Sequence, residues 1–110
     1  MPNTNTNTNT IEMGTLIHGT LRDEDLLQAF SDELARIDET VFSQVIRLDA
    51  HLFVGNLTAA EIVEQLGEYA SDLIWDMQNA LSDLAPAGIY FGNIEGDGSD
   101  FGFWEIPNED

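Results

Sequence analysis

Residues 58–85 read TAAEIVEQLGEYASDLIWDMQNALSDLA, and their spacing predicts one long amphipathic helix around which the rest of the chain is organised. Apolar side chains recur three or four residues apart, which places them on one face of a helix. These residues are Ile62, Leu66, Tyr69, Ala70, Leu73, Met77, Leu81 and Leu84. Thr58 and Glu61 fit a capping box at the start, and Pro86 ends the helix. A break at Gly67 is the alternative, but we expect the helix to continue through it.

The opposite face of this predicted helix is acidic and contains no lysine or arginine. Like charges spaced four residues apart cost an isolated helix about 0.2–0.5 kcal/mol per pair, so folding alone does not explain this row. Trp75 lies near the middle of the row, where a large aromatic side chain is either covered by another element or free to meet a partner. The candidate partner-binding residues are Glu61, Glu64, Glu68, Asp72, Trp75, Asp76 and Asp83.

The charge of the whole chain is strongly unbalanced. Its 110 residues include 21 carboxylates and 3 basic side chains, for a formal net charge of −18. Such a chain repels nucleic acid and anionic membranes and is attracted to basic surfaces, which mostly belong to nucleic-acid-binding proteins. We therefore expect a basic nucleic-acid-binding protein as the partner, with no direct contact to nucleic acid or membrane. The alternative is that the acidic surface serves only solubility, or reflects a salty cytoplasm.

Length and composition predict one small domain over residues 11–110, preceded by a disordered Asn-Thr tail at residues 1–10. The chain has no cysteine, so disulfides and thiolate chemistry are excluded. The first residues lack the basic and apolar regions of a signal peptide, and no apolar run approaches the ~18 residues that span a bilayer. We therefore expect a cytoplasmic protein.

The C-terminal region predicts a β-hairpin. Residues 89–94 and 101–106 are rich in aromatic side chains and flank the sequence EGDGSD, in which Asp97 and Gly98 supply the turn. Gly92 and Gly102 leave room for neighbouring rings or for a close backbone approach.

The region before the long helix predicts a short strand within residues 11–18 and a helix that is capped by Thr20 and extends to Ile37 or Val41. A further helical segment, bent or interrupted around Asp49, is expected over residues 41–53. The expected fold class is therefore α+β, with two or three helices including one long amphipathic helix and with a C-terminal antiparallel β-hairpin.

Metal and catalytic signals are weak. The hairpin turn alternates oxygen-bearing side chains in the manner of a calcium loop, at Glu95, Asp97, Ser99 and Asp100. The match fails, because Asp100 stands where such a loop needs glycine and Ile106 where it needs glutamate. We expect His18 to be a surface residue, since no companion lies at metal-ligand spacing in the sequence. No nucleophile, phosphate-loop or histidine-pair motif occurs, so we expect no metal, no cofactor and no enzymatic activity.

These features favour a small acidic non-enzymatic protein that binds and inhibits a nucleic-acid-binding protein by presenting carboxylates in place of phosphates. In charge and size alone it resembles DNA mimics such as anti-restriction and anti-CRISPR proteins. Duplex DNA carries a charge per about 1.7 Å of axis, against one per about 6 Å for a helical row, so several acidic elements or a homodimer would have to combine. The alternative function is a structural or homo-oligomeric module in which Trp75 or the hairpin aromatics form a self-interface.

Overall fold

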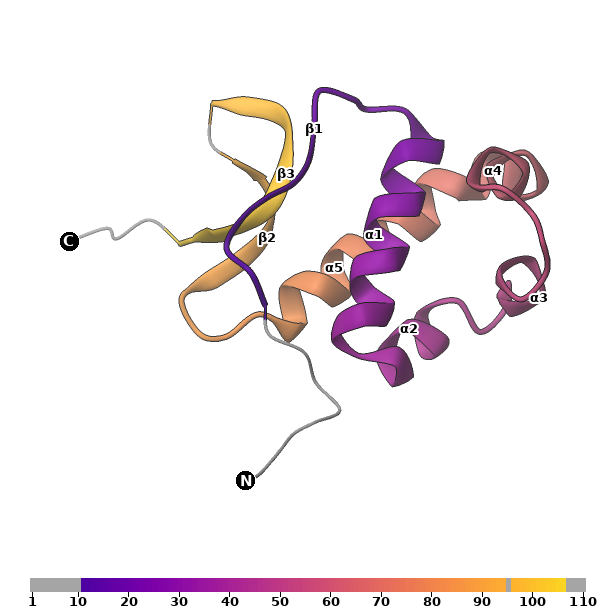
Figure 1. Cartoon of the computed structure of the whole chain (residues 1–110), viewed down its shortest axis with the longest axis horizontal. Coiled ribbons are helices and arrows are strands. Elements are labelled where there is room, and N and C mark those ends of the chain that lie inside the picture. Colours follow the sequence, from indigo (N-terminus) through magenta and orange to yellow (C-terminus); the bar gives the residue numbers. More distant parts are fainter. Residues whose placement is uncertain (1–10, 95, 107–110) are drawn as a thin grey trace.

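The structure, a computed structural model, describes residues 11–94 and 96–106 and has an α+β fold (Figure 1). Its elements are β1 (Gly14–His18), α1 (Asp23–Ile37), α2 (Glu39–Val45), α3 (Ala50–Phe53), α4 (Ala59–Leu66), the 3-10 helix η1 (Gly67–Tyr69), α5 (Ala70–Leu84), β2 (Ile89–Ile94) and β3 (Asp97–Glu105). The predicted fold class and the C-terminal antiparallel strand pair are thereby confirmed. The expected Asn-Thr tail lies outside the described residues.

Within the described residues, three strands form one antiparallel sheet in the order β1-β3-β2. The short strand expected near the start of the chain is therefore present, at one edge of the sheet. The prediction that Asp97 and Gly98 form the hairpin turn is wrong, because both residues belong to β3 and Asp97 already pairs with Ile94. The turn instead contains Gly96, whose φ of 94° is a conformation that glycine adopts without a steric penalty.

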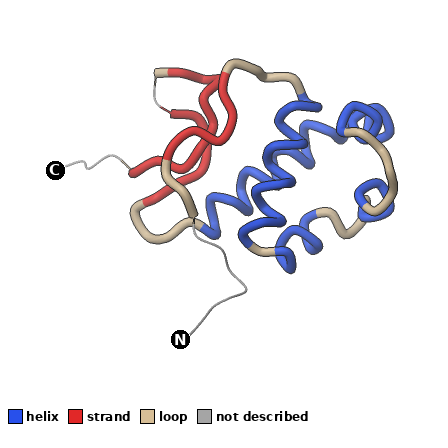
Figure 2. The backbone as a smooth tube through the Cα atoms, viewed as in Figure 1, coloured by secondary structure: helices blue, strands red, loops and turns tan. Residues whose placement is uncertain are grey.

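The helices lie on one side of the sheet, with α1 and α5 packed against each other next to it (Figure 2). Aromatic rings fill the space between these two layers. Phe30 of α1 makes edge-to-face contacts with Phe91 and Phe101, with 5.2 Å between ring centroids in each pair. Phe91 also contacts Phe103, at 4.9 Å, and all four rings are buried. Edge-to-face geometry suits the charge distribution of aromatic rings and adds to the gain from their burial.

The other face of the hairpin carries Tyr90 and Trp104, which are cross-strand partners and remain partly exposed. The indole N–H of Trp104 donates to the carbonyl of Gly92 at 3.0 Å, and the Tyr90 hydroxyl donates to the carbonyl of Asn93, also at 3.0 Å. Strand alternation thus separates the buried phenylalanines from a tyrosine–tryptophan pair that keeps its polar atoms satisfied.

Helical residues run from Ala59 to Leu84, close to the predicted range, but they do not form one straight helix. The run begins with the predicted capping box, in which Thr58 Oγ1 accepts from the Glu61 N–H and the Glu61 carboxylate accepts from the Thr58 N–H. It bends at Gly67, whose φ of 60° and ψ of −125° lie outside the helical region. The axes of α4 and α5 consequently point in different directions (Figure 1).

The segment between α1 and α4 contains the expected interruption around Asp49. A turn over residues 46–49 separates α2 from α3, so this segment forms two short helices. Asp38 caps α2 by accepting from the Val41 N–H at 3.2 Å. In the part of the chain that the structure describes, no helix combines the length and the apolar character needed to cross a membrane.

Candidate functional site

The predicted partner-binding residues are all exposed, and we call them together the acidic face. The bend at Gly67 divides them between two helix directions. Glu61 and Glu64 lie on α4, Glu68 lies on η1, and Asp72, Trp75, Asp76 and Asp83 lie on α5. The sequence predicted that one continuous helix would carry these residues, whereas the structure divides them at Gly67.

The carboxylates of the acidic face have no basic partner among residues 11–94 and 96–106. The ion pairs there join Arg22 to Glu24, Arg36 to Glu33, and His18 to Asp97. The Glu61 carboxylate is engaged in the capping box, where its charge also meets the positive end of the α4 dipole. The other five carboxylates of the face make no hydrogen bond or ion pair within the described residues, so no direct ion pair compensates their charge there.

Trp75 is 58% exposed, which excludes the interpretation that another element of the described structure covers it. Its indole ring thus remains uncovered by residues 11–94 and 96–106. Asp72 lies three residues before Trp75 on α5, and positions three or four apart are neighbours on a helix surface. A large aromatic side chain among uncompensated carboxylates combines an apolar contact with an electrostatic one.

A groove of 670 Å³ lies beside the acidic face, between the α2–α3 region and the η1–α5 region. Its apolar lining includes the buried Leu66 and Leu73, while Leu48 and Tyr69 are 81% and 73% exposed. The lining residues are Gln44, Val45, Arg47, Leu48, Asp49, His51, Leu52, Gln65, Leu66, Tyr69, Asp72, Leu73 and Asp76. Their mixture of apolar surface and charge suits an amphipathic ligand more than a purely polar one.

The acidic face and the groove share Asp72 and Asp76. Asp49 adds a third carboxylate to the lining, opposed by the single guanidinium of Arg47. Trp75 and the other residues of the acidic face are not among the residues that line the groove. Sequence reasoning missed the groove because its two walls, residues 44–52 and 65–76, are brought together only by the packing of separate helices.

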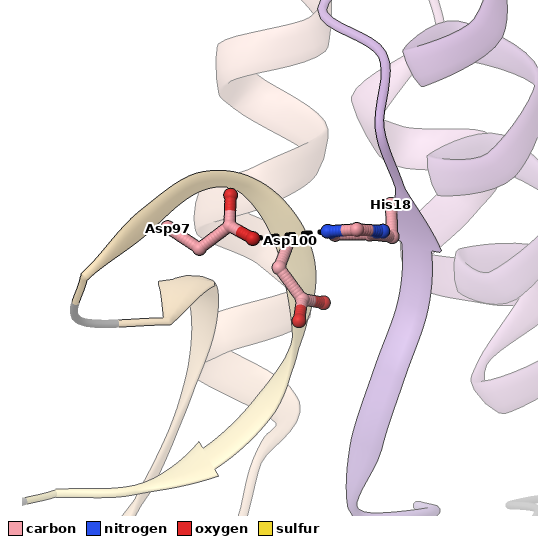
Figure 3. A group of neighbouring side chains, drawn as sticks. All are labelled: His18, Asp97 and Asp100. Atoms are coloured by element: carbon pink, nitrogen blue, oxygen red, sulfur yellow. Dashed lines mark hydrogen bonds and ion pairs between the residues drawn. The ribbon is translucent and has the colours of Figure 1, made fainter.

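A second group of polar side chains lies where β3 begins and β1 ends (Figure 3). His18 of β1 points toward Asp97, with 2.9 Å between Nε2 and Oδ2, and Asp100 lies beside them. One ligand atom from each of the three side chains can be chosen so that all three lie within 4.8 Å of one another. His18 is exposed at the end of β1, as expected, but it has acidic neighbours in space. The sequence could not show them because 79 residues separate His18 from Asp97.

Hydrogen bonds hold the carboxylate of Asp97 in its charged form. The backbone N–H of Ser99, which donates to Asp97 Oδ1 at 3.0 Å, is the main cause of a lowered pKa for this carboxyl. The contacts with the His18 ring and the Ser99 hydroxyl lower the pKa further. A carboxylate stabilised in this way is a negative charge over most of the pH range.

The chain matches no protein-family model, and no curated protein or solved structure matches it.

Proposed function

We propose that this protein binds a basic nucleic-acid-binding protein through the acidic face and inhibits it by occupying the surface that nucleic acid would take. The observation that carries the proposal is the row of exposed carboxylates from Glu64 to Asp83 without a cationic partner in the described structure. Repulsion between like charges on neighbouring helix positions costs folding free energy, and no ion pair in the described structure offsets that cost. A basic partner would relieve that repulsion.

The bend at Gly67 supports mimicry in a way that a straight helix would not. A single helical row carries one charge per about 6 Å, against one per about 1.7 Å of axis in duplex DNA, so it is too sparse in charge to imitate a duplex. Because α4 and α5 point in different directions, carboxylates such as Glu64 and Asp76 approach a partner along two lines. A partner surface shaped for two phosphate strands would meet charges distributed over an area.

Trp75 and the groove supply the apolar part of the proposed interface. Charges steer association and set its salt dependence, whereas buried aromatic anchors account for much of the affinity in protein interfaces. Trp75 is exposed on α5, and the groove beside it offers the exposed Leu48 and Tyr69. We therefore assign specificity and rate to the carboxylates and part of the affinity to these apolar residues.

Affinity capture of a partner protein, followed by its displacement with nucleic acid, tests the proposal. The immobilised full chain is incubated at low salt with host lysate from which nucleic acid has been removed, and retained proteins are then eluted with duplex DNA or with RNA. The proposal predicts a retained nucleic-acid-binding protein that either nucleic acid displaces, because both ligands would compete for one surface. A retained protein that remains bound while it also binds nucleic acid would contradict mimicry.

The alternative, self-association through Trp75 or through the Tyr90–Trp104 face of the hairpin, rests on the exposure of these rings. Salt separates the two functions. Each chain carries a formal charge of −18, so two copies repel each other and their association should strengthen as salt rises. Binding to a basic partner should weaken under the same change. Sedimentation over a range of salt and protein concentrations measures the first effect directly.

A further inference from the structure

The end of the sheet where β1 meets β3 contains three metal-ligating side chains that the acidic face does not involve. The chain is rich in carboxylates, so pairs of acidic residues alone indicate little. His18 is different, because the sequence has only 2 histidines and this one is placed among carboxylates by the pairing of two strands. We propose that His18, Asp97 and Asp100 form a binding site for a first-row divalent transition-metal ion, with Zn²⁺ as the representative ion.

Strand pairing fixes the three ligands. His18 and Asp100 are direct partners in the β1–β3 register, and Asp97 lies three residues before Asp100 in the same strand. Sites on paired strands are positioned more accurately than sites on loops. The three side chains therefore converge from backbone that the sheet already holds in place (Figure 3).

Each carboxylate has one oxygen held by a donor outside the site, and a bound ion would replace the present contact between Asp97 Oδ2 and His18 Nε2. Asp97 Oδ1 accepts from the N–H and the hydroxyl of Ser99, both at 3.0 Å, while its Oδ2 faces the His18 ring. Asp100 Oδ1 accepts from the Thr15 hydroxyl at 2.7 Å. Outer hydrogen bonds of this kind orient metal-ligating carboxylates in known sites.

The spacing of the ligand atoms is close to what a metal requires. Zinc bonds of about 2.1 Å in tetrahedral geometry place ligand atoms about 3.4 Å apart. His18 Nε2 and Asp97 Oδ2 are 2.9 Å apart, and a third ligand atom, on Asp100, lies within 4.8 Å of both. Because the His18 and Asp97 side chains are 56% and 44% exposed, small rotations can bring the three donors onto one ion. Water would complete the coordination.

The donor set selects the class of metal. Calcium takes six to eight oxygen ligands, and magnesium usually retains several waters, so neither gains from an imidazole nitrogen. One imidazole and two carboxylates suit zinc and its neighbours in the first transition row. Two negative charges from Asp97 and Asp100 also balance a divalent cation. The proposed site therefore differs from a calcium loop, because it combines carboxylate oxygens from β3 with an imidazole nitrogen from β1.

Titration of the full chain with Zn²⁺ tests the site. The buffer contains millimolar Mg²⁺, which occupies weak, nonspecific cation sites on the many carboxylates before Zn²⁺ is added. Calorimetry should give one Zn²⁺ per chain for the wild-type protein. His51→Gln is the matched control, because it removes the other histidine, which lies in the groove. We expect His51→Gln to bind as wild type, and His18→Gln and Asp100→Asn each to lose at least about tenfold in affinity.

Imidazole resonances of the wild-type protein give a second readout that needs no variant. The proposal predicts that the ring signals of His18 shift in proportion to added Zn²⁺ up to one equivalent, while those of His51 do not. Equal affinity in His18→Gln and wild type, equal shifts of both histidines, or loss of all Zn²⁺ binding in Mg²⁺ would each overturn the site. Because these residues lie outside the acidic face, failure here would leave the proposed partner binding unaffected.

Discussion

The backbone of Gly14 in β1 passes directly over Gly102 in β3, so closely that a Cβ atom on Gly102 would overlap the Gly14 carbonyl and lie 3.0 Å from the Cα of Thr15. The obstructing atoms belong to the backbone and cannot rotate away. We expect Gly102→Ala to separate β1 from β3 and to lower the free energy of unfolding by about 1–3 kcal/mol or more. Urea denaturation measures the change.

Gly98 provides the control for this prediction, because it lies in the same strand and a Cβ there would meet no atom within 4 Å. Gly98→Ala should change the free energy of unfolding by no more than about 0.5 kcal/mol. Equal effects of the two substitutions would show that the close approach of β1 is not a feature of the folded protein.

A second prediction concerns the packing of α5 against the sheet and α1. Leu81 is fully buried, so Leu81→Ala should cost about 2–5 kcal/mol through lost burial and the cavity that remains. Leu48, at 81% exposed, should tolerate the same substitution with almost no loss. Thermal denaturation compares the two variants, and a similar cost at both positions would contradict the assigned core.

A third prediction concerns the start of α4. Thr58→Ala removes the hydroxyl that accepts the Glu61 N–H, and should lower stability by about 1 kcal/mol. Ser71→Ala is the control, since Ser71 is exposed in the first turn of α5 and makes no side-chain hydrogen bond within the described residues. If Thr58→Ala and Ser71→Ala melt at the same temperature, the capping box does not contribute to stability.

A fourth prediction follows from the lowered pKa of Asp97. A carboxyl whose pKa is lower in the folded state stabilises that state above its unfolded pKa of about 3.9, and the contribution is lost as the pH falls through the folded value. Asp97→Asn should therefore melt below wild type at neutral pH. The difference should shrink as the pH falls below about 4.

Melting curves for this comparison need a chelator, so that metal binding does not contribute. A difference between Asp97→Asn and wild type that stays constant from neutral to acid pH would assign the effect to side-chain shape instead of charge.

The sequence predicted those parts of the fold that depend on local signals. The capping box at Thr58 and Glu61, the apolar stripe of the long helical run and the aromatic strands all follow from spacing along the chain. The close approach expected at Gly102 is also present. The sequence offers the bend at Gly67 only as an alternative, because a glycine inside a helical pattern has a known cost but does not show whether tertiary packing overcomes it.

The parts that the sequence did not predict involve residues that are far apart along the chain. Nothing local to His18 indicates that β1 will pair with β3 and place it beside Asp97 and Asp100. The groove likewise depends on the packing of α2 and α3 beside α5. The exposure of Trp75 could not be decided from helix periodicity, because a position opposite the core is exposed only when no later element covers it.

If the carboxylates of the acidic face bind a basic partner, removing their charge must lower the affinity for a captured partner. Glu64→Gln, Glu68→Gln and Asp72→Asn are combined in one variant. The matched control combines Glu12→Gln, Glu39→Gln and Glu105→Gln, which remove the same charge from exposed positions elsewhere. Both variants should fold as wild type, because none of the six substitutions removes a packed side chain.

We expect the acidic-face variant to bind the partner about tenfold more weakly and with a shallower dependence on salt, while the matched control stays close to wild type. Equal weakening in both variants would mean that only net charge matters and that the face is not a binding site. Unchanged affinity in the acidic-face variant would remove Glu64, Glu68 and Asp72 from the mechanism altogether.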